Sequence, residues 1–154
     1  MTKASDVIAA LAGKTLATAE SCTGGLIGAA LTAVPGSSNV YKGGIVSYWS
    51  QIKHSLLGVE EAALDQFGPV SSQVAAQMAK GARAALDTDI AVSVTGLAGP
   101  GGDDFGNPVG TVFIGYSDDR GEIVEKHLFS GDRETVRNLA ADAALKLVLR
   151  KITE

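Results

Sequence analysis

Ala19-Glu20-Ser21-Cys22-Thr23-Gly24-Gly25 is the stretch around which this chain is organised, because it turns a short strand into a helix. Residues 14–18 before it contain β-branched threonines and are typical of a strand. After it, apolar residues recur at helical spacing, namely Ile27, Ala30, Leu31 and Val34. The first N–H groups of such a helix face whatever lies in front of them. The turn therefore gathers anion donors beside a hydroxyl and a thiol that could act as nucleophiles.

Two interpretations of this turn are open on its sequence. In one, Ser21 or Cys22 is a nucleophile, and the N–H groups of residues 22–25 bind an oxyanion or a substrate. In the other, Ser21 or Thr23 is the N-cap of an ordinary helix, and the glycines serve only the bend. For Cys22 we favour a small buried residue. Glu20 is either an orienting carboxylate or a surface acid.

Composition places the chain among globular proteins. It has 154 residues, of which 45% are hydrophobic and 19% charged, so we expect a single domain over residues 1–154. The net charge of -4 and the lack of a basic run argue against binding to nucleic acid or to an anionic membrane. No apolar stretch approaches the roughly 20 residues that cross a bilayer.

Cysteine usage and the first residues indicate a cytoplasmic protein. One cysteine excludes an internal disulfide, and residues 1–6 lack the apolar core of a signal peptide. The adjacent acids Asp103 and Asp104 are of the kind that is usually solvated, and no cluster has the spacing of metal ligands. The alanine-rich helices offer flat apolar faces that a homodimer could use.

Hydrophobic periodicity predicts an α/β fold with a mixed, partly parallel sheet. A single helix separates the first two strands, so a right-handed crossover should make them parallel. Residues 118–121 join the last two strands as a hairpin, so part of the sheet is antiparallel. The expected strands are 14–18, 43–49, 90–95, 111–117 and 122–130; the expected helices are 7–11, 27–34, 50–57, 60–67, 71–86 and a long one capped by Asp132.

A glycine-rich loop, residues 96–108, follows the strand 90–95, where open α/β sheets bind their ligands. Its N–H groups could hold a phosphate, although it matches neither a Walker A loop nor a dinucleotide fingerprint. Arg133 and Arg137 begin the last helix. They could reach such a phosphate, or pair with neighbouring acids such as Asp132 on a wet surface.

A serine nucleophile needs a base, and Lys53 is the candidate. The two histidines, His54 on a short helix and His127 in an outer strand, are badly placed for this role. Lys53 follows the second strand, and parallel strands would bring it to the same sheet edge as Ser21. Burial could lower its pKa enough, and Tyr48 could bridge the two by hydrogen bonds. The alternatives are a solvated lysine and a half-buried strand tyrosine.

Six sequence blocks in order resemble one known family, the CinA C-terminal domain or nicotinamide-nucleotide amidohydrolase (NMN deamidase) family. The resemblance covers nearly the whole chain. The blocks are Ala19-Glu-Ser-Cys-Thr-Gly-Gly25, Gly43-Gly-Ile-Val-Ser-Tyr48, Gly68-Pro-Val-Ser71, Val94-Thr-Gly-Leu-Ala-Gly-Pro100, Pro108-Val-Gly-Thr111 and Ser130-Gly-Asp-Arg133.

The resemblance implies hydrolysis of the carboxamide of nicotinamide mononucleotide to nicotinate mononucleotide and ammonia, a step of NAD salvage. It also implies a three-layer α/β/α domain that needs no metal and no cofactor. Larger CinA proteins carry a further N-terminal domain, so we expect a stand-alone amidohydrolase. The alternative functions are a pyridine-nucleotide-binding regulatory module without turnover and an accessory protein that binds a partner.

The same resemblance assigns roles to residues. It makes Ser21 the nucleophile and Tyr48 and Lys53 its partners in deprotonation. The N–H groups around residues 23–25 are expected to stabilise the oxyanion. The candidates for binding the substrate phosphate are Thr95, Gly96, Ala98, Gly99, Arg133 and Arg137.

Overall fold

The sheet of this protein is mixed, as the hairpin signature predicts. In the computed structural model, which describes residues 1–154, the strands are β1 (Leu16–Glu20), β2 (Tyr41–Val46), β3 (Ile90–Gly96), β4 (Thr111–Asp118) and β5 (Gly121–Leu128). Their order in the sheet is β2-β1-β3-β4-β5. β1 is parallel to β2 and β3, whereas β4 is antiparallel to β3 and β5 to β4.

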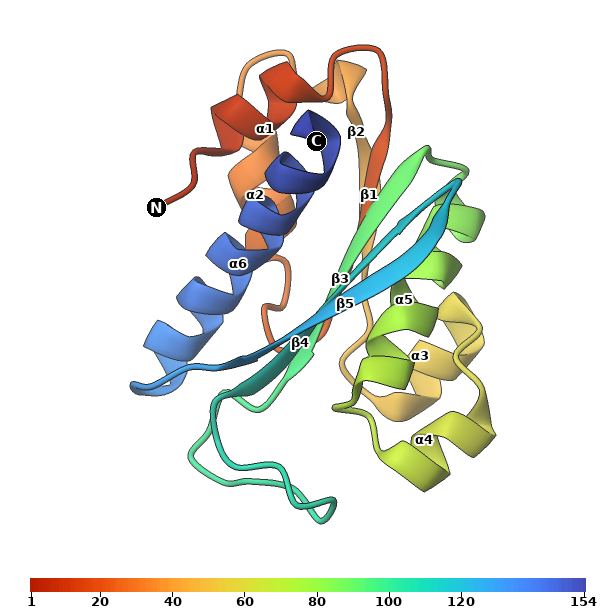
Figure 1. Ribbon diagram of the computed structural model, residues 1–154, viewed down its shortest axis with the longest axis vertical. Helices are drawn as coiled ribbons and strands as arrows, with labels where there is room; N and C mark the ends of the chain where they lie inside the picture. Colours follow the sequence, from red (N-terminus) through yellow and green to blue (C-terminus); the bar gives the residue numbers. More distant parts are fainter.

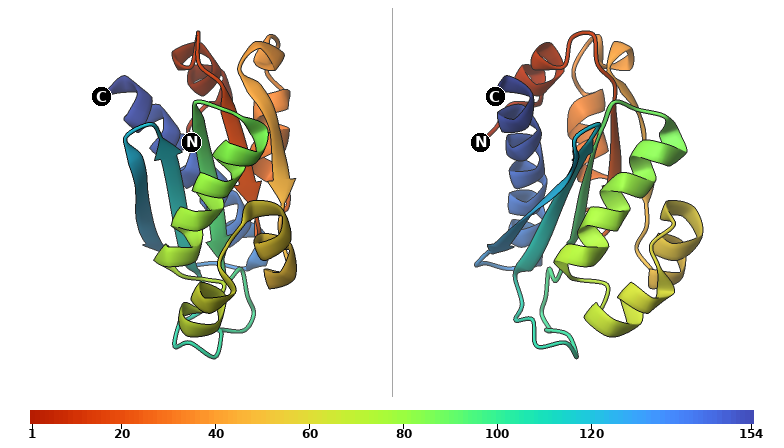
Figure 2. Two further views of the ribbon diagram at one scale, coloured as in Figure 1. Left: turned by 90° about the vertical axis from the view of Figure 1, so that its right-hand side faces the viewer. Right: turned by 45° about the vertical axis from the view of Figure 1, so that its right-hand side comes forward.

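Helices cover both faces of the sheet and make three layers (Figures 1 and 2). One face carries α1 (Ala4–Ala10), α2 (Leu26–Thr32) and α6 (Arg133–Thr153). The other carries α3 (Ser50–Leu57), α4 (Glu61–Phe67) and α5 (Ser72–Leu86). A single 3-10 turn, η1 (Ser37–Asn39), precedes β2. None of these helices is both long and apolar enough to cross a membrane.

The central strands are buried because both faces are covered. Every residue of β1 is buried, and so is all of β3 except its last residue. A core of 23 buried residues fills the space between the sheet and α1, α2 and α6. A second core of 10 residues includes Leu57, Val74 and Met78 and lies between the sheet and α3, α4 and α5. β1 contributes residues to both cores, so it is packed from both faces where it leads into the turn.

Two of the differences between the expected and the observed strand boundaries bear on the site. β1 runs to Glu20, two residues beyond the predicted end, because Glu20 still pairs with Val46 and Val94 on either side. β2 ends at Val46, before the predicted end. Its last bond to β1 is from the Ser47 N–H to the Glu20 carbonyl at 2.7 Å, and beyond it no partner strand continues. Tyr48 therefore lies outside the sheet.

One edge of the sheet collects the segments that could carry chemistry. The carboxyl ends of β1, β2 and β3 meet there because the three strands are parallel. The turn 21–25, the segment 47–49 and the loop 97–110 extend from these ends, and the first turn of α6 lies beside them. In Figure 1 this is the lower end of the molecule.

Candidate active site

Ser21 and Lys53 are hydrogen-bonded to each other at this edge. The Lys53 Nζ donates to the Ser21 Oγ at 2.9 Å. It also donates to the main-chain carbonyls of Ser47 at 2.8 Å and Tyr48 at 3.0 Å. Ser21 follows β1 directly and Lys53 lies in the first half of α3, so the parallel pairing of β1 and β2 brings them together. The two carbonyls gave no sequence signal, because any residue type supplies a carbonyl.

The Lys53 amine is buried and has no carboxylate partner. Its side chain is only 1% exposed, and burial lowers the pKa of Lys53 to about 8. A lysine with this pKa loses its proton around pH 8 instead of above pH 10, and the neutral amine can accept a proton from a hydroxyl. The histidines lie elsewhere: His54 contacts the Val59 carbonyl and His127 contacts Glu125.

Tyr48 does not bridge Ser21 and Lys53 as expected. Its side chain is 57% exposed, and its hydroxyl accepts a hydrogen bond from Arg133 at 3.1 Å. It reaches Lys53 only through its main-chain carbonyl. The strand ends before Tyr48, so its side chain is free to turn outward to α6. Arg133 also donates to the Gly99 carbonyl and thereby ties the glycine-rich loop to Tyr48.

Glu20 is an orienting carboxylate rather than a surface acid. It is 2% exposed and accepts hydrogen bonds from the N–H groups of Gly25 at 3.1 Å, Ile27 at 3.0 Å and Gly28 at 3.0 Å. A carboxylate at this position satisfies the free N–H groups of α2 and complements the helix dipole. The start of α2 is thus already occupied by an anion of the chain itself.

The two glycines of the turn are not free anion donors, which corrects the sequence expectation. The Gly25 N–H donates to Glu20, and the Gly24 N–H donates to the Ser21 carbonyl at 3.1 Å. Both residues have left-handed backbone, with φ of 59° at Gly24 and 110° at Gly25. Their role is the bend, which other residues adopt only with strain.

The rest of the site consists of two residues of the turn, Cys22 and Thr23, and of Arg137 beside them. Burial raises the pKa of the Cys22 thiol to about 11, which disfavours the thiolate and hence a cysteine nucleophile. Thr23 is fully buried, and its Oγ1 has no hydrogen-bond partner. The Arg137 side chain donates to the carbonyls of Cys22 at 2.9 Å and Thr23 at 3.2 Å. It pairs with no acid, contrary to one of the two expectations for it.

The glycine-rich loop is anchored at its start. The Thr95 Oγ1 donates to the Pro69 carbonyl at 2.7 Å, which leaves this hydroxyl committed to the loop before α5. Gly96 has no room for a side chain, because a Cβ would lie 2.7 Å from Val112. Ala98 is buried. Among the six residues expected to bind the substrate phosphate, only Gly99 and Arg133 are hydrogen-bonded to each other.

The acids of the loop have a structural explanation. The Asp103 carboxylate accepts hydrogen bonds from the N–H groups of Phe105 and Asn107 and from the Asn107 side chain. It therefore braces the loop from within. Three or more His, Cys, Asp or Glu side chains placed to hold a metal ion are not found anywhere in the chain.

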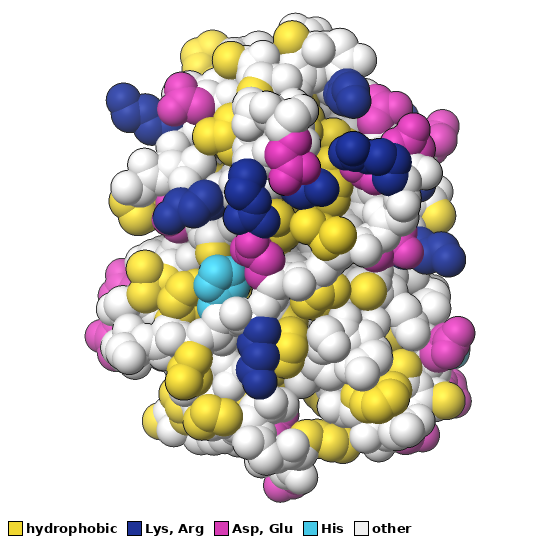
Figure 3. All heavy atoms as spheres, viewed as in Figure 1, with side chains coloured by type: hydrophobic (Ala, Val, Ile, Leu, Met, Phe, Trp, Pro, Cys, Tyr) yellow, Lys and Arg dark blue, Asp and Glu magenta, His cyan; other side chains and the backbone are white.

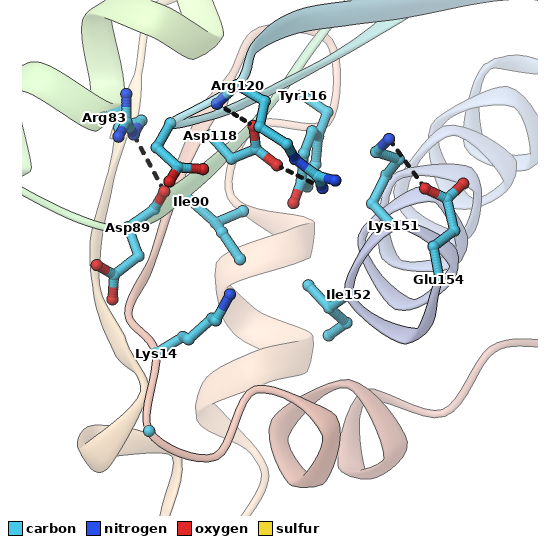
Figure 4. Close-up of a pocket in the computed structure, with 12 residues that line it drawn as sticks. Lys14, Arg83, Asp89, Ile90, Tyr116, Asp118, Arg120, Lys151, Ile152 and Glu154 are labelled. Carbon is cyan, nitrogen blue, oxygen red and sulfur yellow. Dashed lines mark hydrogen bonds and ion pairs between the residues drawn. The ribbon is translucent and has the colours of Figure 1, made fainter.

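A polar hollow of about 490 Å³ lies at the opposite end of the sheet from Ser21 and Lys53 (Figure 4). Lys and Arg side chains gather in the upper half of the face seen in Figure 3, with Asp and Glu among them. Three cations of the hollow bind neighbouring groups: Arg120 pairs with Asp118 at 3.2 Å, Lys151 pairs with Glu154 at 3.1 Å, and Arg83 donates to the Asp89 carbonyl at 3.0 Å. No serine or cysteine lines it. It is therefore a weaker candidate for catalysis than the Ser21–Lys53 edge.

Comparison with known proteins gives a consistent result. The family model of the CinA C-terminal domain matches residues 2–152. A protein of Enterobacter agglomerans named nicotinamide-nucleotide amidohydrolase PncC is 49% identical over 134 residues, which are 86% of this chain and 82% of that protein. A CinA-like protein of Salinibacter ruber is 48% identical over 90% of this chain, but the chain spans only 34% of that relative's length.

Solved structures agree with the fold. A CinA superfamily protein from Klebsiella pneumoniae matches with a TM-score of 0.94 at 32% identity, over 97% of this chain and 95% of that one. The superfamily protein from Escherichia coli matches with a TM-score of 0.91 at 35% identity, over 96% of this chain and 89% of that one. The family model, the relatives and these structures together place the chain in the CinA C-terminal domain family.

Proposed function

We propose that this chain is an amidohydrolase that converts nicotinamide mononucleotide to nicotinate mononucleotide and ammonia. The observation that carries the proposal is the buried Lys53 amine, 2.9 Å from the Ser21 Oγ and without a counter-ion. The PncC relative, whose name states this class of reaction, supports the choice of substrate. A protein that only bound the nucleotide would gain nothing from a buried amine, because moving an amine out of water costs free energy.

The reaction follows from the positions of Ser21 and Lys53. Neutral Lys53 takes the Ser21 proton, and the Ser21 Oγ bonds to the amide carbon, whose π electrons move to the oxygen. The tetrahedral intermediate collapses, the C–N bond breaks, and Lys53 returns the proton to the leaving nitrogen as ammonia forms. Water then attacks the acyl-enzyme, with Lys53 as base, and frees the carboxylate and Ser21. Because only neutral Lys53 can begin this sequence, turnover rises with pH up to about 8.

The arginines take different parts in this proposal. Arg133 is exposed at the rim, contacts Gly99 and Tyr48, and can turn its guanidinium to a substrate phosphate. Arg137 is committed to the carbonyls of the turn. The phosphate therefore lies on the Arg133 side, beside the glycine-rich loop. A cytoplasmic location, a homodimer and independence from metal stay predictions.

The test is ammonia release from nicotinamide mononucleotide by the purified protein, with a chelator present and Ser21→Ala measured in parallel. We expect turnover that persists in the chelator and disappears in the variant. The matched control is Ser72→Ala, which changes an exposed serine at the start of α5. Saturable nucleotide binding without ammonia would make the chain a regulatory module instead. Full activity of Ser21→Ala would refute the proposed mechanism.

A further inference from the structure

A positive charge at the Ser21–Lys53 pair has no carboxylate to balance it. The three oxygens that the Lys53 Nζ binds are uncharged, namely the Ser21 hydroxyl and the carbonyls of Ser47 and Tyr48. The acid next to Ser21 in the chain, Glu20, accepts three N–H groups at the start of α2 instead. Because Lys53 is only 1% exposed, a proton on its amine is stabilised by neutral dipoles alone.

The other ionisable groups on the elements around Lys53 do not supply a negative charge either. They are Cys22 in the turn, Arg133 and Arg137 on α6, His54 on α3, and Lys80 and Arg83 on α5, which packs against α3. The pKa of about 11 keeps the Cys22 thiol neutral at pH 7, and the others are bases. The acid closest to α3, Glu61, pairs with His54 and is 75% exposed by side chain. Any second cation that enters the site therefore acts on the Lys53 amine without compensation.

The proposed substrate brings such a cation. In nicotinamide mononucleotide the ring nitrogen is bonded to ribose, so the pyridine ring is positively charged, and the carboxamide is attached to this ring. The amide carbon has to come within about 3.5 Å of the Ser21 Oγ to react. Since the Lys53 Nζ is 2.9 Å from the same oxygen, the charge of the ring lies on the order of 6 Å from the amine. Two positive charges this close repel each other, most strongly where water is excluded.

We propose that the positively charged ring of the bound nucleotide expels the proton of Lys53, so that the substrate generates the general base that attacks it. The inference rests on the proposed function. The proton passes to the solvent buffer as the nucleotide binds, and the amine keeps the lone pair that accepts the Ser21 proton. At an effective dielectric constant of about 20, the repulsion lowers the pKa of Lys53 from about 8 to roughly 6–7 in the complex.

The price of this arrangement is affinity at low pH, and its benefit is that the complexes that form are reactive. The value of kcat/KM reports the free enzyme, so it should reach half of its maximum near pH 8. The single-turnover rate constant at saturating nucleotide reports the bound complex, so it should reach half of its maximum at roughly pH 6–7. Half-maxima that coincide near pH 8 in the wild type would overturn the proposal.

Calorimetry of the inactive Ser21→Ala variant counts the proton directly. Binding is measured at about pH 7.5 in buffers of different ionisation enthalpy, which gives the number of protons released. The two ligands are nicotinamide mononucleotide and its 1,4-dihydro form, whose ring is uncharged. Both contain the same ribose, phosphate and carboxamide, so the contributions of these groups cancel. The charged ring should release about half a proton more than the uncharged ring.

Two double variants test whether this proton comes from Lys53. In Ser21→Ala combined with Lys53→Met, the two ligands should release equal numbers of protons. In Ser21→Ala combined with Lys151→Met, the difference should remain, because Lys151 pairs with Glu154 at the far end of the sheet. Circular dichroism verifies the fold of each protein. A difference that persists without Lys53 would assign the proton to another group and overturn the proposal.

The outcomes separate this inference from the proposed function. If Ser21→Ala keeps its turnover, or if the wild type neither binds nor hydrolyses nicotinamide mononucleotide, the proposed function has failed and the inference fails with it. If the wild type hydrolyses the nucleotide, Ser21→Ala is inactive, and both ligands release the same number of protons, only the inference is overturned.

Discussion

Lys53 at one end of the sheet and Lys151 at the other show one side chain in two surroundings. Lys53 is 1% exposed and donates to three uncharged oxygens. Lys151 is 18% exposed by side chain, pairs with Glu154 at 3.1 Å, and lies over the Tyr116 ring. Burial without a counter-charge favours the neutral amine of Lys53, whereas the Lys151 amine has a carboxylate beside it. The pKa of Lys53 is therefore lowered by the absence of water and of a carboxylate around its amine.

The largest expected effect comes from removing the buried amine. Lys53→Met keeps an unbranched apolar stem and removes the amine, so the fold should persist. Turnover should fall by about 10³- to 10⁴-fold, because Ser21 then has no base. Single-turnover kinetics with circular dichroism of both proteins measure this, and Lys151→Met is the control that should keep its activity. Activity of Lys53→Met within tenfold of the wild type would remove Lys53 from the mechanism.

A second prediction uses pH to sharpen the contrast. The pKa of Lys53 is about 8 in the folded protein and 10.5 when unfolded, so between these values the unfolded chain binds more protons. Stability from this group is therefore lowest below pH 8 and rises toward pH 10.5. The difference in unfolding free energy between wild type and Lys53→Met should shift in favour of the wild type by on the order of 3 kcal/mol from pH 7 to 10.5.

Denaturant titrations of the two proteins at each pH measure this difference, and contributions from other groups cancel. A difference that stays constant from pH 7 to 10.5 would show that Lys53 titrates alike in both states. The corresponding comparison of the wild type with Lys151→Met serves as the reference for a lysine that has a carboxylate partner.

The smallest effect is expected at the far end. Glu154→Gln breaks the exposed pair with Lys151, and such pairs contribute about 0–1 kcal/mol. Turnover should not change, and thermal unfolding should shift by no more than a few degrees. A loss of activity in this variant would mean that the far end communicates with the Ser21–Lys53 edge.

Much of the fold, and the proximity of Ser21 and Lys53, could be predicted from the sequence. The single helix between the first two strands predicted their parallel pairing, and this pairing brings Ser21 and Lys53 to one edge. The mixed sheet followed from the residues at 118–121. These features depend on local periodicity and turn chemistry, which one sequence contains.

What the sequence did not predict depends on contacts between distant segments. Tyr48 turns outward because β2 ends two residues earlier, where β1 has no further partner to offer. The Gly25 N–H donates to the carboxylate of Glu20, five positions before it. The expected strand ended at residue 18, so nothing in the sequence indicated that Glu20 would be buried against the turn. Arg137 was expected at a phosphate or an acid, and it lies instead on two carbonyls that carry no side-chain signature.

The contact between Arg137 and Cys22 joins residues 115 positions apart. During synthesis the turn leaves the ribosome well before α6 does. A nascent chain that already contains Ser21 and Lys53 still lacks the guanidinium that binds the Cys22 and Thr23 carbonyls. The order of translation therefore delays the complete hydrogen bonding of the turn until α6 docks.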